Sequence, residues 1–212
     1  MITCPNCGEM ALDEVLIYNE NLRKQDFRIT PVLPTCKLCG AEADVFHKCG
    51  GGNIIVLTGT CGSGKSTIAE IFMQKGFAAM DGDCIMQTVK HKRSIARVEF
   101  NDMFDEVACQ IDILSLVSDN LVLSHVILPE DLDRYIEIFR SRNLKYTFFL
   151  LKPDYQVAVE RCRTRTCHTS ITPEYWIKHF HETLEFDDRV KIVDNGDMSA
   201  EETAEYILAN LD

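Results

Sequence analysis

The most constraining feature of the sequence is a glycine-rich stretch that directly follows an apolar run. Residues 54–58 read Ile-Ile-Val-Leu-Thr, and the next eight residues match the pattern G-x-x-x-x-G-K-[ST]. Such a loop, placed between a strand and a helix, directs backbone N–H groups at phosphates, and the helix adds the positive end of its dipole. Lys65 can reach the β- and γ-phosphates, and the Ser66 hydroxyl can bind Mg²⁺. The pattern predicts a nucleoside triphosphate site formed by Gly59, Thr60, Cys61, Gly62, Ser63, Gly64, Lys65, Ser66 and Thr67.

The apolar pattern downstream of this loop predicts an α/β fold. We expect strands at 54–58, 78–81, 120–124, 146–151 and 190–194. Helices are expected at about 64–75, 85–117 (with a break), 129–142, 153–165, 173–186 and 199–210. Short apolar strands that alternate with helices are typical of a parallel sheet covered by helices on both faces.

Composition narrows the class of protein. The 212 residues carry a formal charge of −11 and 46% hydrophobic residues, which suits one core domain plus an appendage. No apolar run approaches the roughly 20 residues of a membrane span, and the N-terminus lacks the features of a signal peptide. Ten cysteines without an export signal favour reduced thiols and metal ligation, so we expect a cytoplasmic protein.

Two C-x₂-C-G motifs lie ahead of the phosphate-binding pattern. Cys4, Cys7, Cys36 and Cys39 form two thiolate pairs separated by 28 residues, a set that suits tetrahedral Zn²⁺. We expect a small β-rich zinc ribbon over residues 1–49, with the domain that carries the glycine-rich loop over 53–212; free or redox-active pairs are the alternative. Residues 1–52 hold five Lys or Arg against seven Asp or Glu, which argues against a nucleic-acid partner. A structural role, or docking of a protein partner or a second copy, is therefore preferred.

Two further groups of residues suggest phosphoryl transfer. Asp81 and Asp83 follow the second strand, where one could orient or deprotonate an acceptor hydroxyl and the other could organise Mg²⁺. Arg161 and Arg165 lie four residues apart on a predicted helix and could stabilise the charge of the transferring group, with residues 166–170 as a lid. The alternatives are an Asp-Gly turn and a solvated basic helix end.

These motifs together resemble a known family. The run T-G-x-x-G-S-G-K-S-T, the D-G-D after the second strand and R-x-R-x-R at 161–165 look like the small P-loop kinases, among them gluconate, shikimate, adenylyl-sulfate and adenylate kinases. The resemblance covers about residues 53–212. It implies a three-layer αβα sandwich of the P-loop NTPase class, with a five-stranded parallel sheet in the order 2-3-1-4-5. It also implies that the loop after the last strand lies against the adenine.

The third strand departs from the usual pattern. It ends in Ser124-His125 and carries no aspartate at the position where many P-loop ATPases have one. This favours a kinase that relies on the pair after the second strand. His125 could contact the acceptor or could be an ordinary strand-end residue. The basic residues 91–93 and Arg97 could recognise an anionic group, although a solvated helical face is the simpler interpretation.

The sequence therefore predicts an ATP-dependent phosphotransferase that acts on a hydroxyl or phosphate of a small metabolite, nucleoside or nucleotide. The catalytic candidates are Lys65, Asp81, Asp83, Arg161 and Arg165, and the cofactors are ATP, Mg²⁺ and structural Zn²⁺. Two alternatives stay open: an ATP-binding regulatory module that docks a partner through the ribbon, and a nucleic-acid end kinase. The loop does not distinguish ATP from GTP.

Overall fold

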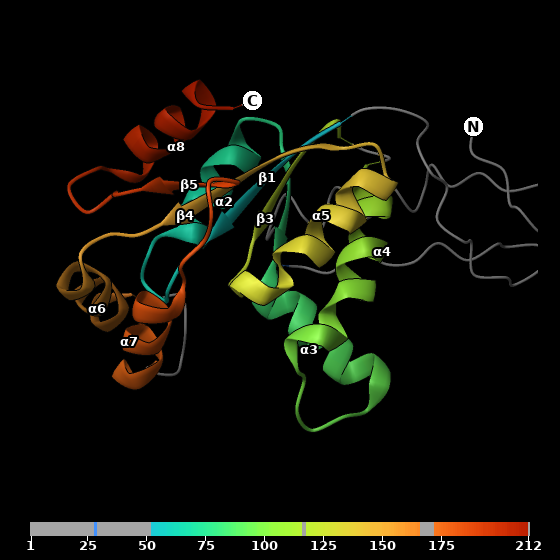
Figure 1. Ribbon diagram of the computed structural model, residues 1–212, viewed down its shortest axis with the longest axis horizontal. Helices are drawn as coiled ribbons and strands as arrows, with labels where there is room; N and C mark the ends of the chain where they lie inside the picture. The colour runs from blue at the N-terminus through green and yellow to red at the C-terminus, as the bar shows by residue number, and fades with distance from the viewer. Residues whose placement is uncertain (1–27, 29–51, 116–117, 166–171, 212) are drawn as a thin grey trace, which may run out of the picture.

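Five parallel strands form the centre of the molecule (Figure 1). The computed structural model of the chain describes residues 28, 52–115, 118–165 and 172–211. The strands are β1 (Asn53–Thr58), β2 (Ala78–Asp81), β3 (Asn120–Ser124), β4 (Lys145–Leu151) and β5 (Val190–Val193). They pair in the order β2-β3-β1-β4-β5, which confirms the predicted order.

Helices cover both faces of this sheet. Two of them, α2 (Lys65–Gln74) and α8 (Ala200–Ala209), pack on one face, where Ile68, Phe72 and Ile207 are fully buried. On the other face lie α3 (Gly82–Arg93), α4 (Phe104–Leu114) and α5 (Leu132–Ser141), together with the short 3₁₀ helices η1 (Phe100–Met103) and η2 (Pro129–Asp131). The result is the expected three-layer αβα sandwich.

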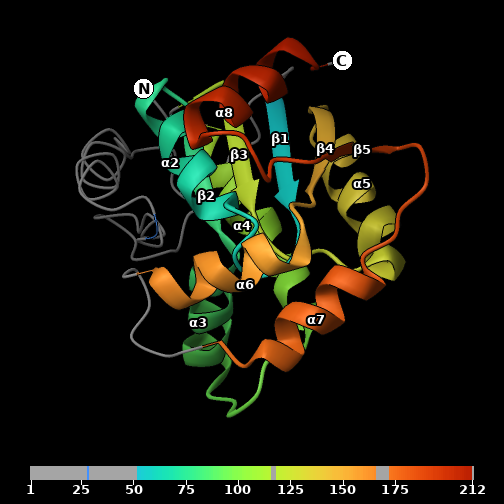
Figure 2. The ribbon, with the colours of Figure 1, turned by 90° about the vertical axis from the view of Figure 1, so that its left-hand side faces the viewer.

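The remaining two helices lie beyond the carboxyl end of the sheet. Figure 2 shows α6 (Tyr155–Thr164) and α7 (Glu174–Thr183) crossing below the tip of β1. They pack on each other through Ala158, Val159, Cys162 and Ile177, with Cys61 of the glycine-rich loop against the same cluster. This pair therefore stands beside the loop that the sequence analysis singled out.

One expected helix, 85–117, is divided in the structure. Ser94 adopts a left-handed conformation with φ of 52° and ends α3, and its N–H donates to the carbonyl of His91. Glu99 and Asp102 then form a capping box that starts η1, and α4 follows directly. The break lets the chain turn back, so that α3 and α4 contact each other.

The predicted zinc ribbon, including Cys4, Cys7, Cys36 and Cys39, lies outside the described residues. Within the part of the chain that the structure describes, no three His, Cys, Asp or Glu side chains gather closely enough to hold a metal. In the same part, no helix is long and apolar enough to cross a membrane.

Candidate active site

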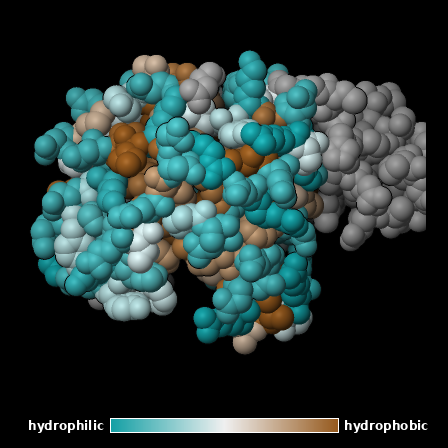
Figure 3. All heavy atoms as spheres, in the orientation of Figure 1, coloured by the Kyte–Doolittle hydropathy of each residue, from teal (hydrophilic) through white to brown (hydrophobic). Residues whose placement is uncertain are grey.

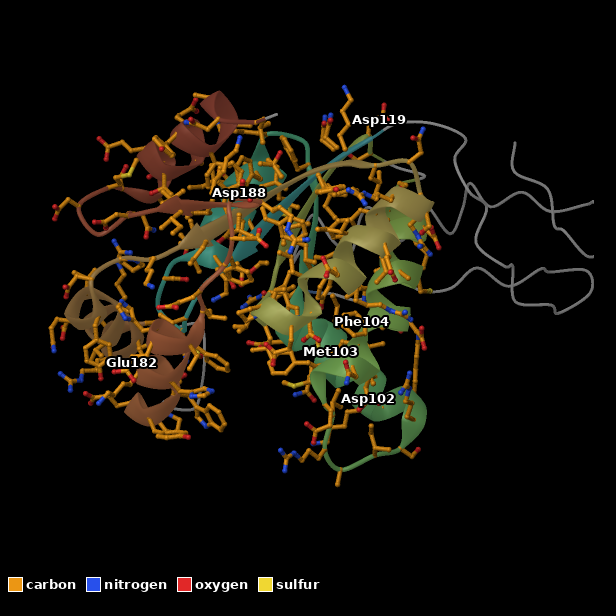
Figure 4. All side chains as sticks on the ribbon, viewed as in Figure 1. Asp102, Met103, Phe104, Asp119, Glu182 and Asp188 are labelled. Carbon is orange, nitrogen blue, oxygen red and sulfur yellow. The ribbon has the colours of Figure 1, made fainter. Side chains whose placement is uncertain are left out.

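The surface is hollowed at the carboxyl end of the sheet, between two lobes (Figure 3). One lobe carries α6 and α7, and the other carries α3, η1, α4 and α5. Figure 4 shows Glu182 of α7 on one side and Met103 and Phe104 on the other. We call the Gly59–Ser66 loop with α6 and α7 the phosphate-loop side, and α3, η1, α4 and α5 the aromatic side.

Backbone conformation and close packing determine the shape of the glycine-rich loop. Gly62 has a φ of +80°, and a Cβ there would lie 2.2 Å from the carbonyl oxygen of Ala158 in α6. Only glycine combines this dihedral angle with this approach. The Thr60 hydroxyl donates to the carbonyl of Ile177 at 2.8 Å, which attaches the loop to α7 as well. The loop is thus held by α6 and α7.

Lys65 is the first residue of α2 and its side chain folds back over the loop. Its Nζ donates to the carbonyls of Gly59 and Thr60, at 2.8 and 2.9 Å. Burial lowers the pKa of Lys65, and the neighbouring Cys61, Asp83 and Asp81 act in the opposite direction. Lys65 therefore lies on the loop with the aspartate pair within electrostatic reach.

Three oxygen-bearing side chains meet beside Lys65. The Ser66 hydroxyl donates to Oδ2 of Asp81 at 3.2 Å and lies 3.3 Å from Oγ of Ser124. Asp81 and Ser124 are register partners at the ends of β2 and β3, so the sheet itself brings them together. Sequence analysis mentioned Ser124 only because an aspartate is missing at the end of the third strand. It missed that Ser124 lies opposite Asp81 in the sheet.

The two aspartates occupy different environments. Asp81 is buried, caps α3 by accepting from the N–H groups of Asp83 and Cys84, and also accepts from Ser66. Burial raises the pKa of Asp81, repulsion from Asp83 adds to the rise, and these hydrogen bonds oppose it. Asp83, in the first turn of α3, is exposed, and its carboxylate accepts no hydrogen bond from the described residues. The pair is therefore divided into one anchored and one accessible carboxylate.

The predicted arginines have contacts that differ from each other. Arg161 of α6 donates to the carbonyls of Asn195 and Gly196, at 3.0 and 3.2 Å, in the loop between β5 and α8. Arg165 is the first residue after α6 and donates to the hydroxyl of Thr172. Residues 166–170, expected as a lid, lie outside the described residues.

Asn195 connects this loop to the phosphate-binding loop. Its Nδ2 donates to the carbonyl of Ser63 at 3.0 Å, and its Oδ1, like Oγ of Ser63, is buried without a hydrogen-bond partner among the described residues. Sequence analysis expected the loop after the last strand to lie against the adenine and assigned no role to Asn195. The structure brings it against the phosphate-binding loop itself.

His125 and the basic residues of α3 lie on the aromatic side. Burial, together with the charge of Lys65, lowers the pKa of His125 to about 3, so its imidazole is neutral. Lys92 pairs with Glu106, Arg93 with Asp102 and Arg97 with Glu99. These ion pairs favour the interpretation of residues 92, 93 and 97 as a structural and solvated face over that of an anion site.

Comparisons with known proteins agree with this geometry. A family model for dephospho-CoA kinase matches residues 53–112, from β1 into α4. A gluconokinase from Sinorhizobium meliloti is 25% identical, over 74% of this chain and 90% of that one, with a TM-score of 0.55. These likenesses indicate an ATP-dependent kinase.

Two further solved structures share the fold of this kinase. A sugar kinase from Janibacter sp. is 19% identical over 74% of this chain and 93% of its own, with a TM-score of 0.55. The tunicamycin resistance protein of Deinococcus radiodurans is 16% identical over 76% and 97%, with a TM-score of 0.56. A search of curated proteins finds no significant match.

Proposed function

We propose that this kinase transfers the γ-phosphoryl group of ATP to a hydroxyl or phosphate of a small metabolite, nucleoside or nucleotide. One observation carries the proposal: the side chains of Ser66, Asp81 and Ser124 contact one another beside Lys65. The exposed Asp83 follows Asp81 by two residues. Small P-loop kinases need the same three functions in one place: phosphate binding, metal binding and positioning of the attacking group.

The donor set suits Mg²⁺. Two hydroxyls and one carboxylate are hard oxygen ligands, and Mg²⁺ in nucleotide sites commonly takes few protein ligands besides phosphates and water. Ser66, Asp81 and Ser124 would hold the ion, which neutralises charge on the triphosphate when it is bound. Asp81 is suited to this work because backbone N–H groups keep its carboxylate in place.

The remaining candidates divide the work of transfer. Lys65 contacts the β- and γ-phosphates once its bonds to the loop carbonyls are exchanged for bonds to the nucleotide. Asp83 accepts the proton of an attacking hydroxyl, because it is exposed and lies next to the anchored Asp81. Arg165 reaches the transferring group. Arg161 instead positions the Asn195–Gly196 loop, which the resemblance places against the adenine.

Substitution of the two aspartates by asparagine tests this division. Asn caps a helix as well as Asp does, so Asp81→Asn and Asp83→Asn remove charge while α3 keeps its start. We expect Asp83→Asn to reduce transfer at least about 100-fold with ATP affinity little changed. Asp81→Asn should raise the Mg²⁺ concentration needed for half-maximal activity.

ADP release and calorimetric ATP binding provide both measurements. The matched control is Asp105→Asn on α4, whose side chain is 86% exposed and which should leave transfer unchanged. Full turnover in both Asp81→Asn and Asp83→Asn would remove the basis of the proposal.

We also propose that Cys4, Cys7, Cys36 and Cys39 bind a structural Zn²⁺, and that this segment docks a protein partner or a second copy of the chain. The spacing of the two C-x₂-C-G motifs and the excess of acidic residues over residues 1–52 support it. Metal analysis of the purified full chain should find one zinc per chain, and its absence would refute the assignment.

A further inference from the structure

The side chain of His125 is buried in the candidate site with an unused nitrogen. It is 7% exposed, and its Nε2 has no hydrogen-bond partner among the described residues. Leaving such a group unpaired costs free energy, and native proteins usually avoid it. An unpaired imidazole nitrogen next to a proposed metal site therefore suggests a group that binds there during function.

The surroundings of His125 define where that group would lie. A Cβ on Gly82 would be 2.1 Å from Nδ1 of His125, so the ring packs directly against the residue between the two aspartates. On its other side, the ring centroids of Phe100 and Tyr135 lie 5.8 and 6.2 Å from that of the imidazole. The imidazole thus stands between the aspartate pair and the rings of Phe100 and Tyr135.

The charges around this position indicate the chemistry of the bound group. Asp81 and Asp83 would repel an anion. On the aromatic side, Lys92 donates to Glu106 at 2.8 Å and Arg93 to Asp102 at 2.8 Å, so these two cations are already paired. An uncharged hydroxyl satisfies an imidazole nitrogen in either tautomer, because it both donates and accepts. The ring of Phe100, which is only partly buried, suits the apolar face of a sugar or a nucleoside.

We propose that Nε2 of His125 hydrogen-bonds an uncharged hydroxyl of the phosphoryl acceptor and holds the acceptor between the aspartate pair and the ring of Phe100. The inference rests on the proposed function and adds to it a residue and a substrate class: a neutral, hydroxyl-bearing small molecule such as a sugar or a nucleoside. Glycine at position 82 serves this arrangement, because any other residue would displace the imidazole.

Kinetics of His125 variants with a panel of D-ribose, D-glucose, glycerol and adenosine test the inference. His125→Phe keeps an aromatic ring of similar size and removes both nitrogens, while His125→Gln returns a polar nitrogen. We expect His125→Phe to raise KM for the panel member that wild type uses about 10- to 100-fold, the loss of a buried hydrogen bond. His125→Gln should recover part of the loss, and ATP affinity should stay within about twofold, because the imidazole does not belong to the phosphate-loop side.

Binding without turnover separates this inference from the proposed function. With a non-hydrolysable ATP analogue present, a panel member should shift the ¹⁵N resonances of His125 in wild type. A shift without any transfer would refute the proposed function and leave the inference standing. The inference is overturned if KM is unchanged in His125→Phe, if stability falls while KM does not move, or if no panel member binds. If the phenyl ring of His125→Phe prevents folding, His125→Leu provides the same comparison.

Discussion

The two sides of the hollow are built from different chemical groups. On the phosphate-loop side, side chains bind backbone carbonyls: Lys65 those of Gly59 and Thr60, Thr60 that of Ile177, and Asn195 that of Ser63. On the aromatic side, side chains bind one another, through the rings of Phe104 and Tyr135 and through ion pairs such as Lys92 with Glu106.

This difference explains why one side has a recognisable sequence pattern and the other has none. A site made from the backbone requires particular dihedral angles and small residues in a continuous stretch, so it leaves a motif. A site made from side chains on η1, on α5 and just after β3 draws on separated segments whose spacing can vary. The nucleotide site can therefore be predicted from the sequence, and the acceptor site cannot.

Gly62→Ala breaks the phosphate-loop side and should have the largest effect on stability. The change adds a Cβ 2.2 Å from the carbonyl of Ala158 at a φ of +80°. Together, backbone strain and overpacking should cost about 2–5 kcal/mol. Gly76→Ala is the matched control, with a φ of +92° and no atom within 4 Å of the new Cβ, and should cost only about 1–2 kcal/mol. Urea unfolding measures both, and equal losses would show that packing on α6 does not shape the loop.

Lys92→Met tests whether the cations of the aromatic side serve the fold. Glu106 is 7% exposed, and removal of Lys92 leaves its carboxylate with the Gln110 amide as its remaining hydrogen-bond partner among the described residues. We expect a loss of about 1–3 kcal/mol with kinetics of transfer unchanged. Lys90→Met, on the exposed surface of the same helix, should change stability by less than about 0.5 kcal/mol. An increase in the acceptor KM without loss of stability would instead make Lys92 a substrate ligand.

Asp187→Asn tests the connection between the two sides and should have the smallest effect. Arg189 binds Asp187 ahead of β5 and Asp133 of α5, and its hydrogen bond to Asp187 lowers the pKa of that carboxyl to about 2. Because the folded pKa lies below the ordinary 3.8, the stabilisation is present above pH 3.8 and disappears as the pH falls towards 2. The difference in Tm between wild type and Asp187→Asn should close over that range, and a constant difference would contradict the assignment.

Much of the fold could be predicted because apolar patterning is local. The strands at 78–81 and 120–124 were predicted at their observed bounds, and the other three each differ by one residue at one end. A break within 85–117 was predicted but its position was not, because the left-handed Ser94 and the Glu99–Asp102 capping box depend on how the chain turns back. The sequence could not assign the contacts of Arg161 either, since Asn195 and Gly196 are more than 30 residues away.

By itself, the sequence determined the phosphate-binding loop, the parallel sheet and the presence of two aspartates after the second strand. These features depend on neighbouring residues, whose chemistry and spacing are visible in one stretch of chain. The tertiary structure alone decided that Asp81 is anchored and Asp83 accessible, that Ser124 meets Ser66, and that His125 is buried with an Nε2 that bonds to no other described residue. Those outcomes depend on strand register and on helix packing, which bring distant residues together only once the chain has folded.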